Sequence, residues 1–187
     1  AYPPEATSRL LAWRNLLFPL INPKFGFAMG SLYALLGHFW NQGQGMLFGP
    51  VILILGFILF TDTHDVWYKR IAGTAHGLAH TAAAWALLGL TRDLAPALGL
   101  HHNLALEAFN GAFMFATGSL IGPFLMGVYL LVSLNVFGRH SNEAFSSLRI
   151  EDYKNFLRLH IGPDGALTIF PVGIERVPRH WKATGAT

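Results

Sequence analysis

The stretch that decides the fold is AFNGAFMFATGSLIGPFLMGVYLLVSLNVFG, which runs from Ala108 to Gly138 without a formal charge. Two further stretches, Phe25 to Thr61 and Ile71 to Thr91, are equally free of Asp, Glu, Lys and Arg. An ionised side chain at the centre of a bilayer costs about 3 kcal/mol or more, so membrane spans exclude charge in this way. The sequence therefore predicts helices that cross a lipid bilayer.

The composition of the whole chain agrees with that prediction. Of its 187 residues, 52% are hydrophobic and only 12% are charged, whereas ordinary globular domains carry about 25% charge. The chain has no cysteine, which excludes a disulfide framework and thiolate metal sites. A net charge of +3 is too small to indicate nucleic acid as a partner. The predicted partner is the lipid bilayer.

We expect a mainly α fold, a helical transmembrane bundle of about four spans. Proline and glycine punctuation places the four segments at Pro23–Trp40, Met46–Thr61, Ile71–Leu90 and Asn103–Phe137. Asn22 and Asn103 are suited to cap the first and last of them. The last segment holds Pro123, which predicts one long kinked helix rather than two helices, because no polar turn accompanies the proline.

Three regions follow from this assignment. Residues 1–22 mix Arg9 and Arg14 with Trp13 and leucines, which predicts an interfacial amphipathic segment or, equally, a helix packed on protein. Residues 23–138 form the transmembrane helical domain, and residues 139–187 form a soluble α+β tail. Four spans place both termini on one side of the membrane, and the excess of Lys and Arg there predicts the cytoplasmic side, whereas a fifth span would move the tail across.

The tail is expected to contain a β-hairpin. Residues 156–161 (FLRLHI) and 167–172 (LTIFPV) alternate in polarity, and Gly162-Pro163-Asp164-Gly165 between them is strong turn chemistry. Pro171 marks an edge strand because it cannot donate a backbone hydrogen bond. A hairpin of two strands is marginal alone, so this one needs a sheet or a surface to dock on.

His76 and His80 are the strongest candidates for metal ligands. They stand four residues apart on one face of the third helix, a spacing at which two imidazoles can hold one metal ion or contribute to a haem site. His38, His64, His101 and His102 could supply further ligands. The alternative is that neutral histidines hydrogen-bond to neighbouring helices among small residues that allow close packing.

No catalytic constellation is complete in the sequence. Asp62-Thr63-His64-Asp65 matches Asp-x-His, the first motif of two-metal phosphoesterases, but such a site needs several more ligands around two ions, and the alternative is a polar loop that ends a helix. Neither a phosphate-binding glycine loop nor a Gly-x-Ser-x-Gly turn occurs. We therefore assign no catalytic and no cofactor-binding residue from the sequence.

A resemblance to a known family enters at the C-terminal end. The segments NEAFSSLRIEDYKNFLRLHI (residues 142–161), LTIF (167–170) and VPRHW (177–181) closely resemble the end of membrane-bound calcineurin-like metallophosphoesterases. The upstream segments FTDT (60–63) and HGLAH (76–80) are similar to the membrane region of the same proteins, more loosely. The resemblance is strong over about 45 residues.

The resemblance implies that this chain is the membrane anchor and C-terminal portion of such a metal-dependent phosphoesterase, a hydrolase. The family's metal motifs have no counterpart here, so its two divalent metal ions are expected in a phosphoesterase domain absent from this chain. The tail would dock on that domain, with Arg149, Lys154 and Arg158 meeting acidic protein or lipid headgroups. The alternatives are a histidine-liganded haem or metal membrane protein and a structural subunit of a larger membrane complex.

Overall fold

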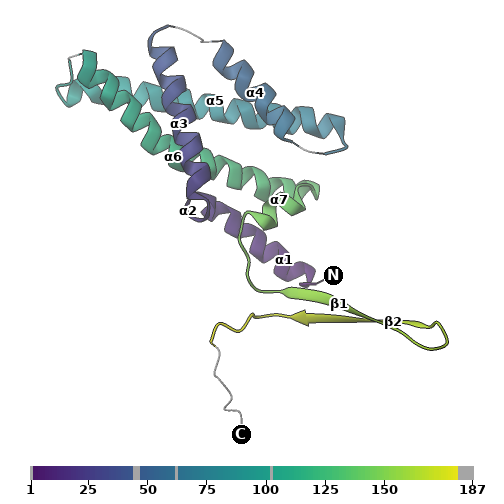
Figure 1. The fold of residues 1–187 in the computed structure, drawn as a ribbon. Helices are drawn as coiled ribbons and strands as arrows, with labels where there is room; N and C mark the ends of the chain where they lie inside the picture. The colour runs from purple at the N-terminus through teal and green to yellow at the C-terminus, as the bar shows by residue number, and fades with distance from the viewer. Residues whose placement is uncertain (1, 44–46, 62, 102, 181–187) are drawn as a thin grey trace. The chain divides into compact units, whose positions relative to one another are not determined.

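The computed structural model describes residues 2–43, 47–61, 63–101 and 103–180, apart from the Asn103 side chain. Within these ranges the chain is mainly helical and ends in a two-stranded antiparallel hairpin (Figure 1). It divides into two compact units, which we call the helical unit, Ala12–Leu148, and the tail unit, Ala1–Leu11 with Arg149–Thr187. The domain boundaries predicted at 22/23 and 138/139 stay a prediction.

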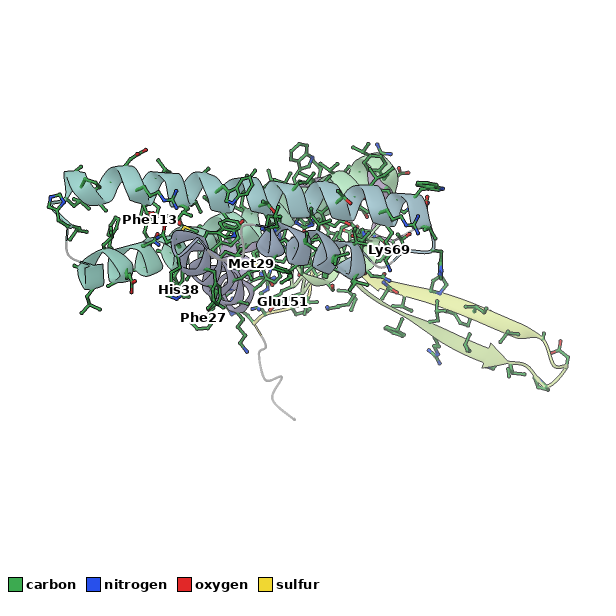
Figure 2. All side chains as sticks on the ribbon, turned by 90° about the horizontal axis from the view of Figure 1, so that it is seen from above. Phe27, Met29, His38, Lys69, Phe113 and Glu151 are labelled. Carbon is green, nitrogen blue, oxygen red and sulfur yellow. The ribbon has the colours of Figure 1, made fainter. Side chains whose placement is uncertain are left out.

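Over its described residues, the helical unit contains a 3-10 turn and six helices. These are η1 (Trp13–Leu17), α2 (Phe18–Ile21), α3 (Pro23–Asn41), α4 (Phe48–Phe60), α5 (Val66–Ala97), α6 (Asn103–Phe137) and α7 (Ser141–Ser146). Helix α3 packs along α6, and α4 packs along α5 (Figure 1). In Figure 2, Met29 of α3 lies toward the other helices and Phe27 lies on the outer side, in agreement with exposures of 6% and 66%.

Small residues bring α3 and α6 close together. A Cβ atom added at Gly26 would lie 2.9 Å from the Ser119 carbonyl oxygen, and one added at Gly118 would lie 2.6 Å from the Tyr33 Cβ atom. Gly122 approaches Met29 in the same way. These glycines therefore serve helix packing, as small residues do at membrane helix interfaces.

Glycines also allow α4 and α5 to approach closely. Added Cβ atoms at Gly73 and Gly77 would lie 2.5 and 2.6 Å from the Cα atoms of Ile58 and Ile54. Since backbone atoms cannot move aside as side chains do, only glycine fits at these two positions. The close contact brings α4 onto the helix face that carries the two histidines.

Helix α5 is longer than the predicted third span and takes in Lys69 and Arg70 before it and Arg92 and Asp93 after it. It begins after Asp65, whose carboxylate accepts hydrogen bonds from the backbone N–H groups of Trp67 and Tyr68, the usual role of an N-cap. The cap predicted at Asn22 is not formed. Although α3 begins at Pro23 as expected, the Asn22 side chain donates to the Ser147 carbonyl at 3.1 Å instead.

Four spans are not supported. Among the described residues, only the segment Leu104–Phe137 is both long and apolar enough to cross a membrane. Helix α4 has 13 residues and reaches about 20 Å at 1.5 Å per residue, short of the roughly 30 Å hydrocarbon core. Helices α3 and α5 have the length but carry more polar residues. Helix α6 is a single helix that contains Pro123, as predicted, and the kink expected at the proline stays a prediction.

The second half of the N-terminal segment packs on protein. Asn15 and Phe18 are buried, and the backbone of Asn15 lies directly against Gly127 of α6. Asn15 also accepts a hydrogen bond from the Ser147 hydroxyl at 3.3 Å. Between Trp13 and Ile21 the segment therefore contacts the helical unit, while Trp13, Leu17 and Leu20 stay exposed.

The tail unit contains α1 (Glu5–Ala12, except its last residue), β1 (Lys154–Ile161) and β2 (Leu167–Ile174). The predicted hairpin is present, with strands that extend beyond residues 156–161 and 167–172, and Phe156 lies opposite Val172 and Ile161 opposite Leu167. The turn is also as predicted: the Gly162 N–H donates to the Ala166 carbonyl at 2.9 Å. Tyr2 lies over Gly173 and meets the Tyr153 ring edge-on at 6.3 Å.

Candidate functional site: a buried network of histidine and tyrosine

The two predicted histidines lie side by side in the interior of the helical unit. His76 is 4% exposed and His80 is fully buried. Their Nε2 atoms are 3.1 Å apart, a distance at which one imidazole donates a hydrogen bond to the other. A buried charge would need a counter-ion, so both imidazoles are neutral in this arrangement.

Helix α3 supplies the next member of the network. The Tyr33 hydroxyl lies 2.9 Å from the Nδ1 atom of His80 and 3.5 Å from the His80 carbonyl oxygen. Two proton arrangements satisfy these contacts: the phenol donates to Nδ1 of His80, or Nδ1 donates to the phenol while the phenol donates to the His80 carbonyl. The three side chains form a hydrogen-bonded row from α3 to α5.

Aromatic rings enclose the pair from two further helices. Phe57 of α4 stacks on His80 with ring centroids 4.5 Å apart, and Tyr129 of α6 stacks on His76 at 4.4 Å. The close approach of α4 at Gly77 makes the first stacking possible. Four helices therefore meet at the histidine pair.

Tyr129 extends the polar row toward the end of α6. Its hydroxyl lies 3.1 Å from the Thr61 hydroxyl and 3.0 Å from the Nε2 atom of His140. His140 is buried with a φ of +59°, in the left-handed region that few residues other than glycine adopt. Glu143 lies 3.5 Å from its Nδ1 atom. These contacts hold His140 in an uncommon backbone conformation.

An apolar groove runs beside the network between α5 and α6. It has a volume of about 430 Å³, and among the residues that line it are Ala72, Ala75, His76, Val128 and Tyr129. The Nδ1 atom of His76 is buried and has no hydrogen-bond partner among the described residues. The Nδ1 atom of His140 is the other buried polar atom of the described residues without a hydrogen-bond partner.

A metal ion would find two donors here. Two ligands on one tetrahedral zinc ion are about 3.3 Å apart, given bonds of about 2.0 Å, which is close to the observed 3.1 Å. In the described parts of the chain, however, no three or more His, Cys, Asp or Glu residues come together in a group that could hold a metal ion. The residues fit a metal site only in part.

The other histidines proposed as ligands lie elsewhere. His38 contacts Gln42 at 3.2 Å near the end of α3, His64 is exposed in a bend before α5, and His101 is exposed beyond its end. His102 and Asp62 fall outside the described residues. Asp65, which directly follows the Asp-x-His candidate motif, caps α5 and forms an ion pair with Arg139 at 3.3 Å.

The predicted docking cations lie in the tail unit. Lys154 and Arg158 are on β1 with an even separation, so they share one face of the hairpin. Arg149 precedes the strand at a φ of +51°. All three are exposed.

Sequence reasoning found the histidine pair but missed its partners. Tyr33, Phe57, Tyr129 and His140 are far apart along the chain, and each alone is an ordinary residue of an apolar segment or a loop. The only signal was indirect: Gly73 and Gly77 on the histidine face indicated that another helix approaches there.

Comparison of the chain with protein-family models, with curated proteins and with solved structures gives no match.

Proposed function

We propose that this chain is the membrane anchor and tail of a calcineurin-like metallophosphoesterase, whose catalysis is carried out by a separate phosphoesterase domain. The observation that supports anchoring most directly is the apolar outer surface of the helical unit. On α4 alone, the exposed side chains are Phe48, Val51, Ile52, Leu55, Leu59 and Phe60. Water-soluble monomers rarely expose contiguous apolar patches of this kind.

The distribution of charge supports the same placement. The stretches without formal charge coincide with α3, α4, most of α5 and most of α6, and charged residues appear only near the helix ends. In the described part of the chain, helix α6 is the one that meets the length and apolarity needed to cross a bilayer. We propose that the neighbouring helices lie in the bilayer with it, as in the predicted bundle of about four spans, with both termini in the cytoplasm.

The topology can be tested cleanly because the chain has no cysteine. We would introduce single cysteines, Ser8→Cys, Ala97→Cys and Ala166→Cys, and label intact cells and inside-out vesicles with a maleimide that does not cross membranes. The proposal expects Ala97→Cys to react from the outside and the other two only from the cytoplasmic side. Labelling of all three from one side would refute the four-span arrangement.

The tail hairpin is the proposed contact with the phosphoesterase domain. Apart from Asn155, one face of the hairpin carries only apolar residues, which are Leu157, Leu159, Ile161, Leu167, Ile169, Pro171 and Gly173. The opposite face mixes apolar residues with Lys154, Arg158 and His160. Open strand edges are not tolerated in hydrocarbon, since their backbone groups find no partners there, so this surface favours a folded protein over lipid.

Adjacent residues on β1 allow a matched test of that contact. Leu159 belongs to the apolar face and Arg158 to the mixed face, and both are exposed. With a purified calcineurin-like phosphoesterase domain as the binding partner, we expect Leu159→Ser to weaken binding more than Arg158→Ser does. A larger effect of Arg158→Ser would assign docking to the cations instead, and the absence of binding by the unchanged protein would overturn the proposed partner.

The chain itself should be inactive toward phosphoesters. Purified protein supplied with manganese is expected to show no hydrolysis of an aryl phosphate above the rate without protein. Clear turnover that is lost on chelation would overturn the assignment of catalysis to a separate domain.

A metal centre at His76 and His80 is the second candidate, because their Nε2 atoms are close to the separation of two ligands on one ion. Elemental analysis of protein purified without chelators tests it, together with the visible spectrum for haem. One equivalent of metal that is lost in His80→Phe but kept in His38→Phe would favour this candidate. Metal-free, colourless protein would leave the pair as a hydrogen-bonded packing element.

A further inference from the structure

A second pocket, with several polar side chains in its lining, lies at the end of the helical unit where α3 and α5 end and α6 begins. It has a volume of about 580 Å³, within the usual range for small-molecule sites. Its lining includes Asn41 from α3, Arg92 from α5, and Glu107 and Asn110 from α6. Unlike the groove beside His76, this pocket contains both a cation and an anion.

Neither charge of the pocket is neutralised by the other described residues. No ion pair in the described part of the chain includes Arg92 or Glu107. The Arg92 guanidinium donates from Nε and Nη2 to the Asn41 carboxamide oxygen at 3.3 and 3.2 Å, which orients it and leaves its remaining N–H donors. At the pocket floor, Asn110 is 4% exposed and its carboxamide oxygen accepts a hydrogen bond from Thr91 at 2.8 Å.

The position of the two charges along the chain gives the depth of the pocket in a bilayer. Arg92 directly follows the uncharged stretch Ile71 to Thr91, and Glu107 directly precedes the uncharged stretch Ala108 to Gly138. If these stretches occupy hydrocarbon, both charges lie at the level of the lipid headgroups on the same side of the membrane. This step rests on the proposed membrane insertion, and it goes beyond the role of an anchor.

We propose that this pocket binds a zwitterionic phospholipid headgroup that has a phosphate and a primary ammonium group, as phosphoethanolamine has. The phosphate is placed to accept hydrogen bonds from Arg92, since guanidinium groups recognise phosphate by paired, charge-assisted bonds. The ammonium group is placed to donate to the Glu107 carboxylate. An anionic headgroup would meet Glu107 unfavourably, and a quaternary ammonium has no N–H to donate to it.

The test measures lipid binding to the full chain in detergent by native mass spectrometry or by calorimetry. The probes are short-chain phosphatidylethanolamine, phosphatidylcholine and phosphatidylglycerol, with soluble phosphoethanolamine to separate a lipid from a free headgroup. We expect the unchanged protein to prefer phosphatidylethanolamine by tenfold or more. Equal binding of all three lipids would overturn the proposal, and binding of soluble phosphoethanolamine as tight as that of the lipid would exclude the lipid as the source.

Two variants make the assignment specific to the charges. Arg92→Gln should weaken all phosphate-containing probes tenfold or more, whereas Glu107→Gln should weaken phosphatidylethanolamine and strengthen phosphatidylglycerol. Asp93→Asn is the matched control, because Asp93 neighbours Arg92 but does not line the pocket, and it should change nothing. All three positions are exposed, so folding should survive. A Glu107→Gln protein with unchanged preference would refute the role of the anion.

The experiment also separates this inference from the proposed function. Maleimide labelling reports insertion of the helices whether or not the pocket selects a headgroup. If labelling gave the expected topology but the protein showed no headgroup preference, the lipid site would be refuted and the membrane anchor would stand.

Discussion

Replacing Gly77 by alanine should weaken the contact between α4 and α5, whereas the same replacement at Gly89 should strengthen the protein. Both glycines lie inside α5. A Cβ atom at Gly77 would lie 2.6 Å from the Ile54 Cα atom and 2.9 Å from its backbone nitrogen, whereas one at Gly89 would have nothing within 4 Å. The two substitutions are therefore chemically identical and differ only in what surrounds the added methyl group.

The expected magnitude follows from two opposing effects. Alanine gains about 1 kcal/mol over glycine in a helix interior at either position. At Gly77 the helices must separate by about 1 Å to restore an ordinary contact, and overpacking of this kind costs about 1 to 3 kcal/mol. Gly89→Ala should thus raise the free energy of unfolding by about 1 kcal/mol. The free energy of unfolding of Gly77→Ala should be about 1 to 3 kcal/mol lower than that of Gly89→Ala.

The assay is reversible unfolding in mild detergent by addition of sodium dodecyl sulfate, followed by circular dichroism. Hydrogen exchange of α4 gives a local reading, because only Gly77→Ala should speed exchange in that helix. Equal stability of the two variants, with α4 equally protected, would show that α4 does not pack on α5 at this glycine.

Three further predictions concern single contacts. Tyr33→Phe removes the bond to His80 and should lower the free energy of unfolding by about 0.6 kcal/mol, the average for hydrogen bonds between membrane helices, and by no more than about 1.7 kcal/mol. The histidine ¹⁵N shifts should also change, and unaltered shifts would refute the bond. Asp65→Ala removes the N-cap of α5 and should cost about 0.5 to 2 kcal/mol in the same unfolding assay, whereas Asp65→Asn should keep most of it. Gly165→Ala places a side chain at a φ of +79° and should destabilise the hairpin by about 1 kcal/mol, seen as faster exchange in both strands but not in α6.

Much of the fold could be predicted from short stretches of the sequence. The start of α3 at Pro23, the single continuous α6 through Pro123 and the hairpin closed by residues 162–165 were all predictable, because each depends on residues within a few positions. The ends of α5 were not. Its charged flanks resembled loops in composition, but Asp65 caps the helix early and nothing before Gly99 stops it.

The candidate site divides in the same way. The sequence by itself determined that His76 and His80 share one face of a helix, since that follows from the period of the helix, and that the chain offers long uncharged segments suited to lipid. Only the tertiary structure decided that Tyr33, Phe57 and Tyr129 surround the pair and that Arg92 and Glu107 line one pocket. These residues come from different helices, and their meeting depends on which glycines allow which backbones to approach, a property of packed pairs that no single segment contains.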